Sequence, residues 1–582
     1  MKQLKQLLMA HWVTIVIVLM LGVHCLLLGR IAVVNAPVYD EIAHLPSGLS
    51  HWRFGNFSLY RVNPPLMRMI ASLPLLISAP AEDWNGYSEG AYARPEFAVG
   101  RRFLDKNGER SFWHFTIARW AQISVSALGG WICYCWAKAL FGTSSGLLAL
   151  ALWCFDPNLL AWGATITPDA GAATFGVAAG YAFWRWLKSP TWANVAIAGL
   201  ALGLAELTKS TWILLFALWP LIGLIWRFSN RNLEIPKPKL IQLGAILIGG
   251  LYLLNMGYGF EKSFQRLGDF EFISQTLGGP EANETPGNRF RGTLLAEIPV
   301  PVPANFLSGM DVQKYDFERG KSSYLRGETK KGGWWYYYLY AMAVKTPLGT
   351  IALFGLAIAL AVSRADFRMS FSDAVVLLLP AVTVLILVSS QTGFNRYLRY
   401  VLPAYPFLFI FASSAAKAFE LRLKSIAIPV AACAIVAVIG SLSVFPHSMS
   451  YFNLAAGGPT GGPRHLLDAN IDWGQDLLEL KKFLDRHPEA RPIHLAYFGY
   501  ATPGHAGIEF EEVPQYLESE IGLDVPKLEP GWYAVSVNHL YGYQHYENDK
   551  PAYTYFQRFE LFAKAGYSIY IYKIDPEQAV VP

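Results

Sequence analysis

Long apolar runs separated by short polar connections make up most of this 582-residue chain. A membrane-spanning helix needs about 20 mostly apolar residues, and about eleven runs meet that length. They lie at 11–34, 116–138, 144–163, 169–187, 192–208, 210–227, 240–257, 346–363, 372–390, 398–416 and 424–445. The pattern therefore predicts a polytopic α-helical membrane protein with about eleven transmembrane helices.

The pattern changes after residue 445. Residues 475–486 have the apolar spacing of an amphipathic helix, and three later segments alternate like strands: 493–499, 532–538 and 567–574. We therefore predict two domains, a transmembrane domain over 1–445 and a small α/β domain over 446–582. Two long loops, 35–115 and 258–345, interrupt the apolar runs on the same side as the second domain.

Composition agrees with this reading. Hydrophobic residues make up 53% of the chain and charged residues only 16%, whereas soluble domains carry about 25% charged residues. This excludes a soluble enzyme, a disordered protein and a disulfide scaffold. The formal net charge of +5 is too small to indicate a nucleic-acid surface. Basic residues gather in the connections 227–239 and 417–424, which predicts that these loops and the N-terminus are cytoplasmic and that the 446–582 tail is outside.

The first outer loop begins with two acids, Asp40 and Glu41. The apolar residues that follow them recur at helical spacing, and residues 64–76 form a second amphipathic stretch after two prolines. Both stretches are typical of interfacial helices that lie along the membrane plane. The acids are then either partly desolvated carboxylates near a membrane-embedded substrate or simply the start of a helix, where negative charge is favoured.

A third acid, Asp169, lies in the outer turn between the third and fourth predicted spans. Thr167 and Pro168 before it also suit a helix start. Acids gathered on one membrane face suit either of two tasks, the deprotonation of a nucleophile or the binding of a divalent cation. Asp40, Glu41 and Asp169 are the candidate catalytic residues, and Asp40 with Asp169 is the candidate metal pair.

Several basic residues fall on the outer side, where the positive-inside rule disfavours them. Ionisable groups at membrane depth are candidates for function, and Arg and Lys are the usual ligands of phosphate. The alternative is that each side chain extends to lipid headgroups. The candidate phosphate ligands are Arg61, Lys209, Lys345, Arg396 and Arg399.

The tail carries a polar motif around a tryptophan, with Asp472 and Trp473 at its centre. These side chains suit the recognition of a sugar or another acceptor. The alternative is structural, with Asp472 as the N-cap of the amphipathic helix that follows.

Six segments together resemble one family. They are YDEIAHLPSG (39–48), RVNPPLMRMIASLPLL (61–76), TPDAGAATF (167–175), GGWWYYYLYAMAVKTPLG (332–349), NRYLRYVLPAYPFLFI (395–410) and DANIDWGQDLLELKKFL (468–484). The chain resembles the lipid-carrier-dependent glycosyltransferases of family 39, which include protein O-mannosyltransferases and bacterial aminoarabinose transferases. The resemblance implies the GT-C membrane fold, with Asp40 as catalytic base, Glu41 beside it, and Asp169 assisting or binding a metal.

The resemblance also implies a reaction. An inverting transferase would move a hexose or pentose from a polyprenyl-phosphate donor to an acceptor hydroxyl on a glycan, lipid or protein, outside a bacterial inner membrane. The chain differs from eukaryotic O-mannosyltransferases in having Asn63 where they have histidine before Pro-Pro-Leu, and its 258–345 loop is too short for their β-trefoil insertion. The alternative functions are a transporter or lipid flippase and a non-catalytic membrane scaffold.

Overall fold

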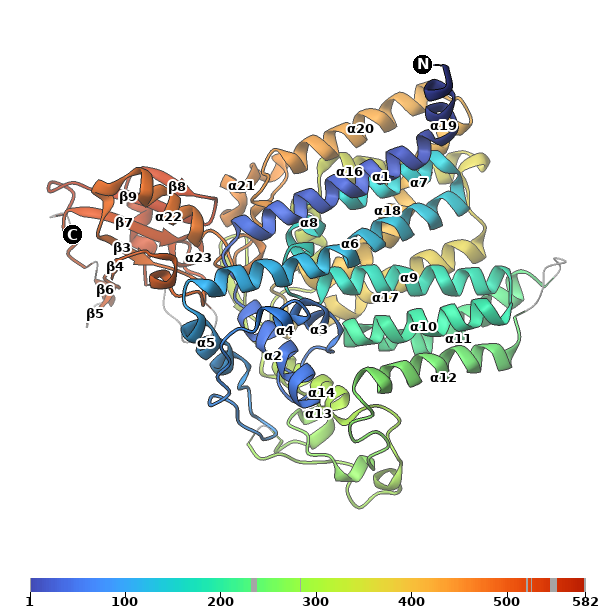
Figure 1. The fold of residues 1–582 in the computed structure, drawn as a ribbon, viewed down its shortest axis with the longest axis horizontal. Coiled ribbons are helices and arrows are strands. Elements are labelled where there is room, and N and C mark those ends of the chain that lie inside the picture. Colours follow the sequence, from blue (N-terminus) through green and yellow to red (C-terminus); the bar gives the residue numbers. More distant parts are fainter. Residues whose placement is uncertain are drawn as a thin grey trace.

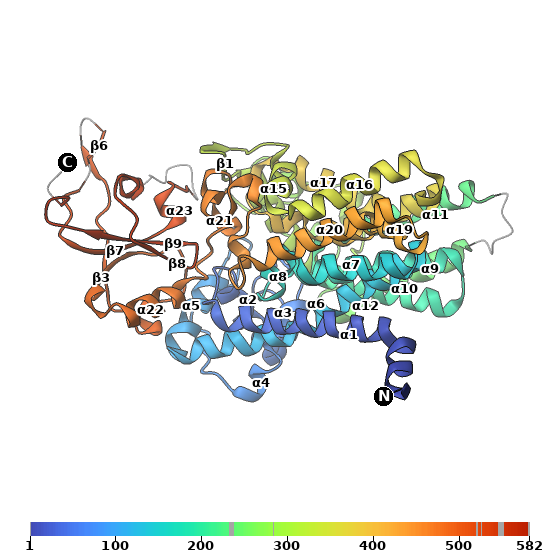
Figure 2. The ribbon, with the colours of Figure 1, turned by 90° about the horizontal axis from the view of Figure 1, so that it is seen from above.

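A computed structural model describes residues 2–231, 238–282, 284–519, 522–524, 526–544 and 552–579. The long helices run side by side as a bundle, and a small β-sheet lies beyond one end of it (Figures 1 and 2). The predicted fold class, a polytopic helical membrane protein with a small C-terminal α/β unit, is confirmed.

Within the described residues, seven helices are long and apolar enough to span a membrane. They are the His11–Val34 part of α1 (Lys2–Val34), α6 (Arg110–Phe141), Ser210–Ser229 with α11 (Leu215–Ser229), α12 (Leu240–Gly257), α17 (Phe371–Ser390), Leu398–Glu420 with α18 (Tyr405–Ala412) and α19 (Lys417–Glu420), and α20 (Lys424–Leu442).

The other four predicted runs are also helical, but each departs from a simple span. Helices α7 (Thr143–Phe155) and α8 (Pro157–Gly163) meet at a 57° bend, and α15 (Tyr337–Lys345) and α16 (Leu348–Ser363) at a 113° bend. Proline just after each break cannot continue a helix. Helix α10 (Trp192–Thr208) is shorter, and α9 (Asp169–Lys188) is not among the candidate spans. Length and composition therefore give seven spans, or nine with the bent pairs, against the predicted eleven.

The two long loops hold short helices. The first contains α2 (Glu41–Phe54), α3 (Leu66–Ser72), α4 (Leu75–Ser78) and α5 (Glu96–Asn107). The first predicted helix is present as α2, and the second predicted stretch, 64–76, forms the two short helices α3 and α4. Gly48 lets α2 lie directly on α3, because a Cβ at this position would be 2.2 Å from the carbonyl oxygen of Arg68. The second loop contains α13 (Gln275–Gly278), α14 (Ala304–Arg319) and an antiparallel hairpin of β1 (Ser322–Leu325) and β2 (Glu328–Lys331).

The C-terminal unit is built on a five-stranded mixed sheet with the strand order β4-β3-β7-β9-β8. Its strands are β3 (Ile493–Ala496), β4 (Phe510–Glu512), β7 (Gly531–Ser536), β8 (Ala563–Ala565) and β9 (Ile569–Ile574), and its main helix is α22 (Leu477–Arg486). The predicted helix and three predicted strands are all present. The remaining elements are α21 (Gly458–Gly461), α23 (Val537–Leu540) and the hairpin of β5 (Leu517–Ser519) and β6 (Gly522–Asp524).

The N-terminus and α19 lie at the end of the bundle opposite the C-terminal sheet (Figure 1). The described parts of the predicted cytoplasmic loop 227–239, at the end of α11 and before α12, lie at that same far end, and residues 232–237 fall outside the described residues. The structure thus separates the two predicted sides by the length of the bundle. Which end faces the cytoplasm stays a prediction.

The segment between α20 and α22 packs into the helical core. Leu466, Ile471 and Trp473 belong to the same buried cluster as the membrane helices, and the Trp473 ring lies 5.4 Å from that of Trp162 on α8. The sheet beyond is thereby fixed to one end of the bundle.

Candidate active site

A cavity of about 750 Å³ lies where the first outer loop meets the bundle. Its walls include the loop before α2, the start of α9 and the residue that follows α10. The second outer loop and the C-terminal unit also contribute to the wall. Four of the predicted site residues line it: Asp40, Asp169, Lys209 and Arg399. Residues separated by hundreds of positions in the chain thus meet at one site.

Asp40 is the N-cap residue of α2, but its carboxylate does not cap the helix. It accepts a hydrogen bond of 2.8 Å from Arg399 Nη2 instead. The Asp40 side chain keeps 18% of its surface exposed, so it faces the cavity while one of its oxygens contacts a cation.

Asp169 is the first residue of α9, where a carboxylate also favours the helix dipole. Its Oδ1 accepts a 2.8 Å hydrogen bond from Lys209 Nζ, and its Oδ2 lies 3.7 Å from Arg399 Nη1. Only 2% of the Asp169 side chain is exposed. Asp169 therefore contacts two of the basic residues that line the cavity, Lys209 and Arg399.

Arg399 lies between the two acids, and aromatic rings pack around its guanidinium. The centroid of the Trp473 ring is 4.4 Å from its Cζ and that of Tyr397 is 4.7 Å away. Cations over aromatic faces are attracted by the ring quadrupole. Arg399 Nε makes no hydrogen bond within the described part of the chain. The formal charges of Lys209 and Arg399 balance those of Asp40 and Asp169. The cavity wall also holds further basic residues and one further acid: Arg94, Arg319, Lys321, Lys331 and Asp316.

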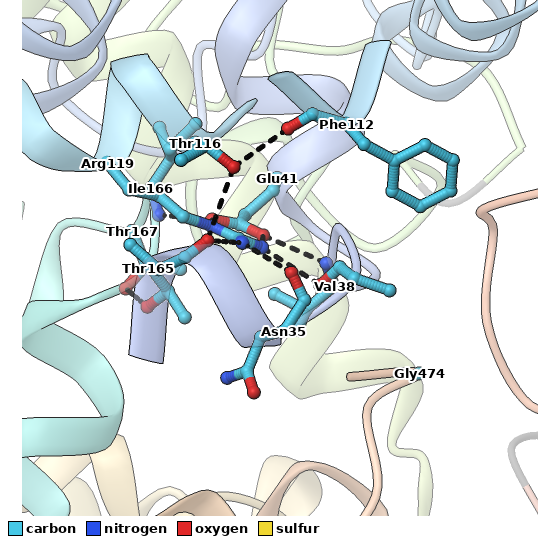
Figure 3. Close-up of polar contacts among 12 residues, drawn as sticks. Asn35, Val38, Glu41, Phe112, Thr116, Arg119, Thr165, Ile166, Thr167 and Gly474 are labelled. Atoms are coloured by element: carbon cyan, nitrogen blue, oxygen red, sulfur yellow. Dashed lines mark hydrogen bonds and ion pairs between the residues drawn. The ribbon is translucent and has the colours of Figure 1, made fainter. Parts of the chain in front are cut away.

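Glu41, the neighbour of Asp40, lies in a different environment (Figure 3). Arg119 on α6 binds it through two nitrogens, with the Nε contact at 2.8 Å. The backbone N–H groups of Ile166 and Val38 also donate to its two oxygens, at 2.7 Å and 2.9 Å. Both side chains of this ion pair are at most 1% exposed. Glu41 joins the first outer loop to the bundle and does not line the cavity.

Lys345 and Arg396 are also absent from the cavity wall. Lys345 Nζ donates to the carbonyl oxygens of Met449 and Asn470, and Arg396 Nε donates to that of Ser322. Both cations therefore hold other segments of the chain against the bundle, and the structure gives them backbone partners where the sequence predicts a phosphate.

Three further predicted residues also make contacts within the fold: Arg61, Asp472 and Trp473. Arg61 donates to the carbonyl oxygens of Gly90 and Ala91 and lines a second cavity of about 420 Å³. Trp473 is buried beneath Arg399. Asp472 is buried and accepts from the backbone of Gly474. It does not cap the following helix, because the N-cap residue of α22 is Asp476.

An apolar groove adjoins the charged cavity. Its volume is about 400 Å³, and its wall includes Leu387 and Val388 of α17 together with Ile213 and Met310. Lys209, Gln313, Phe317, Phe394 and Tyr400 line both spaces. The cationic set therefore lies where an apolar channel meets a polar chamber.

The acids do not form a metal site. In the described ranges, no group of three or more His, Cys, Asp and Glu side chains is placed to hold a metal ion. Asp40 and Asp169 also share the guanidinium of Arg399, and Lys209 contacts Asp169. These residues do not fit a divalent cation, because the protein's own cations occupy the carboxylates.

Sequence reasoning missed most of the cavity wall, including His44, Tyr500 and four basic residues: Arg94, Arg319, Lys321 and Lys331. His44 follows Asp40 by one helical turn, a spacing that could have been read as a shared face. Tyr500 comes from the C-terminal unit and contacts Tyr39 at a ring distance of 4.3 Å. No local pattern connects Tyr500 with Asp40, and only the tertiary fold brings them together.

Residues 112–251 match the family model described as dolichyl-phosphate-mannose-protein mannosyltransferase. The predicted resemblance to that group is confirmed for this stretch, which extends from α6 to α12. No curated protein sequence matches the chain.

Solved structures with a similar fold include ArnT from Cupriavidus metallidurans bound to undecaprenyl phosphate, with 11% identity, a TM-score of 0.46 and coverage of 98% of this chain and 99% of that one. The apo oligosaccharyltransferase of Archaeoglobus fulgidus has 11% identity, a TM-score of 0.44 and coverage of 82% and 58%.

Proposed function

We propose that this chain is an integral-membrane inverting glycosyltransferase. It moves a hexose or pentose from a polyprenyl-phosphate donor to an acceptor hydroxyl on the outer side of a bacterial inner membrane. The observation that carries the proposal is the convergence of Asp40, Asp169, Lys209 and Arg399 in one cavity beside an apolar groove. The family match over 112–251 supports the same class of donor.

The two adjoining spaces suit the two ends of such a donor. The isoprenoid chain would lie in the groove beside Leu387 and Val388, and the sugar would occupy the cavity. The phosphate between them would reach Lys209, which lines both spaces, and Arg399. A guanidinium and an ammonium form strong charge-assisted hydrogen bonds with phosphate oxygens.

Of the two acids that contact Arg399, Asp40 is the better base, because its side chain is 18% exposed and that of Asp169 only 2%. In the transfer step the acceptor oxygen attacks the anomeric carbon opposite the phosphate, and its proton passes to Asp40. The bond between the anomeric carbon and the phosphate oxygen breaks, and its electron pair leaves with the polyprenyl phosphate. Lys209 and Arg399 stabilise the additional negative charge that develops there.

Arg399 links donor binding to the strength of the base. Without a donor it contacts both Asp40 and Asp169. A phosphate in the cavity competes for the same guanidinium, and Asp40 then loses part of its cationic partner. The base is thus released when a donor is present.

The position of the cavity favours an enzyme over a transporter. Transporter sites lie near the membrane midplane between repeats, whereas this cavity is formed with the outer loops and the C-terminal unit at one end of the bundle. A scaffold would need no such set of buried charges. The acceptor, a glycan, lipid or protein, would enter from the side of Tyr500.

The test is sugar transfer by the purified protein in lipid nanodiscs. Short-chain polyprenyl phosphates carrying labelled mannose, glucose, galactose or aminoarabinose serve as donors, with bacterial envelope glycan, lipid and protein fractions as acceptors. A general base contributes about 10²–10⁴-fold, so Asp40→Asn should lower the turnover of the active donor by that factor.

The matched control is Asp485→Asn on α22, whose side chain is 49% exposed and does not line the cavity. It should transfer at the wild-type rate. Full transfer by Asp40→Asn would remove Asp40 from the mechanism. Movement of an unmodified lipid or solute by reconstituted protein, without any transfer from the donors, would favour the transporter.

A further inference from the structure

His44 lies on α2, one turn after Asp40. Its backbone N–H donates to the carbonyl oxygen of Asp40 at 3.0 Å, so the turn between them is helical. Residues four apart on a helix share a face, with Cβ atoms about 5–6 Å apart. Both residues line the charged cavity. A ligand that reaches Asp40 therefore also comes close to His44.

The imidazole of His44 is buried in the cavity wall. Its exposed fraction is 2%, and Nε2 is fully enclosed and unpaired within the part of the chain that the structure describes. Among the other buried histidines, His24 bonds Cys154 and Ser126 through both ring nitrogens, and His51 bonds Asn56. Nδ1 of His114 is also unpaired within the described ranges, but His114 does not line the cavity. Because buried polar groups are normally paired, an unpaired one in a cavity wall calls for a ligand.

The surroundings of His44 define the chemistry of that ligand. Burial, reinforced by the nearby guanidinium groups of Arg68 and Arg399, lowers the pKa of His44 well below its usual value near 6.5. A neutral imidazole has one N–H donor and one acceptor nitrogen. A hydroxyl group is both donor and acceptor and matches it, whereas a phosphate carries charge and suits Lys209 and Arg399.

We propose that His44 binds a hydroxyl group of the sugar that is transferred, and so helps to select that sugar. The inference rests on the proposed function, because it takes the donor sugar to be the ligand of the cavity. The anomeric carbon must lie close to Asp40 during transfer, and the shared face of α2 then brings a ring hydroxyl to His44. Arg68 does not compete, because it is absent from the cavity wall and its Nη1 and Nη2 donate to the carbonyl oxygens of Tyr60 and Pro64.

The test compares two ligands that differ only in the sugar. His44→Phe keeps an aromatic ring against Tyr60, whose centroid is 4.5 Å from that of His44, and removes both nitrogens. Loss of a hydrogen bond that leaves a polar group unpaired should weaken binding of the preferred short-chain polyprenyl-phosphate sugar by about 5- to 100-fold. Binding of the same polyprenyl phosphate without a sugar should not change.

Two further variants locate the contact. Asn reproduces the position of Nδ1 and Gln that of Nε2, so one of His44→Asn and His44→Gln should recover part of the affinity. Deoxy donors provide an independent readout: wild-type protein should discriminate against the analogue lacking one particular hydroxyl, and His44→Phe should lose that discrimination. His51→Phe, also on α2 but outside the cavity, controls for damage to the helix.

The outcomes separate this inference from the proposed function. If wild-type protein binds neither the sugar-bearing lipid nor the bare polyprenyl phosphate, the proposed function fails. If it binds both and His44→Phe weakens both equally, His44 only supports the fold and the inference is wrong. An increase confined to the acceptor KM would also contradict it, because the hydroxyl would then belong to the acceptor.

Discussion

Asp40 and Glu41 are neighbours in the chain, yet their surroundings are opposite. Glu41 has a buried guanidinium and two backbone N–H groups as partners and no contact with the cavity (Figure 3). Asp40 shares one guanidinium with Asp169 and keeps part of its surface open to the cavity. One acid fixes the loop, and the other is available to a substrate.

The difference shows how a site of this kind is supported. The Glu41–Arg119 pair ties the start of α2 to α6 and to the turn before α9. It therefore fixes the backbone from which Asp40 projects, and the turn that precedes Asp169. Rigid positioning of the reacting groups requires such a fully bonded neighbour.

The largest effect should come from breaking the fully buried pair. Removal of one partner leaves an uncompensated buried charge and costs about 3–5 kcal/mol. Glu41→Gln and Arg119→Gln should each lower the free energy of unfolding by about this amount, measured by thermal unfolding in detergent. The double variant should cost less than the sum of the two, because the single variants remove the same interaction.

The corresponding substitution of the acid that faces the cavity is Asp40→Asn. Since its carboxylate is partly exposed and contacts a single guanidinium, the loss of stability should be far smaller than for Glu41→Gln. Equal losses of stability in the two variants would show that both acids are structural.

The next effect concerns donor binding by Arg399. Hydrogen bonds to charged groups contribute about 1.5–3 kcal/mol, which corresponds to roughly a 10- to 150-fold change in affinity. Arg399→Gln should raise the donor KM by that factor and the acceptor KM much less. Arg399→Lys should recover only part of the loss, because it lacks the planar fork. Arg486→Gln on α22 is the matched control, and an unchanged donor KM in Arg399→Gln would move the phosphate site to Lys209.

The smallest expected effect is that of metal removal. Because the cations of Lys209 and Arg399 already contact Asp40 and Asp169, treatment with EDTA should leave the transfer rate unchanged. The measurement is initial transfer rate before and after EDTA, with Mg²⁺ and Mn²⁺ added back. Loss of transfer and its recovery with either ion would instead assign a metal to these two acids.

Much of the fold could be predicted, because hydrophobic runs and their lengths directly reflect burial in lipid. Helix occurs at all eleven predicted runs, and the C-terminal helix and strands lie where their periodicity indicated. The two sharp bends were missed, because Asp156–Pro157 and Pro347 lie inside runs whose average hydropathy remains high. A breaker changes the direction of a helix without changing the composition around it.

The site was only partly predictable. Asp40 and Asp169 could be selected as acids on one membrane face, and Lys209 and Arg399 as cations on the side where the positive-inside rule disfavours them. Lys345 and Arg396 met the same criterion as these cations, yet they bond to backbone carbonyls. The difference depends on where the 446–476 segment and the β1–β2 hairpin fold, which no local pattern reports. The same holds for Tyr500, which reaches the cavity from a separate unit.

The most direct test of the central claim is a structure of the Asp40→Asn variant with a short-chain polyprenyl-phosphate sugar bound. The variant should retain the donor intact because it lacks the base. We predict the phosphate in contact with Lys209 and Arg399, the isoprenoid chain in the groove beside Leu387 and Val388, and the anomeric carbon facing the side chain at position 40. A donor bound elsewhere, with Arg399 still joined to Asp169 and the cavity empty, would contradict the account.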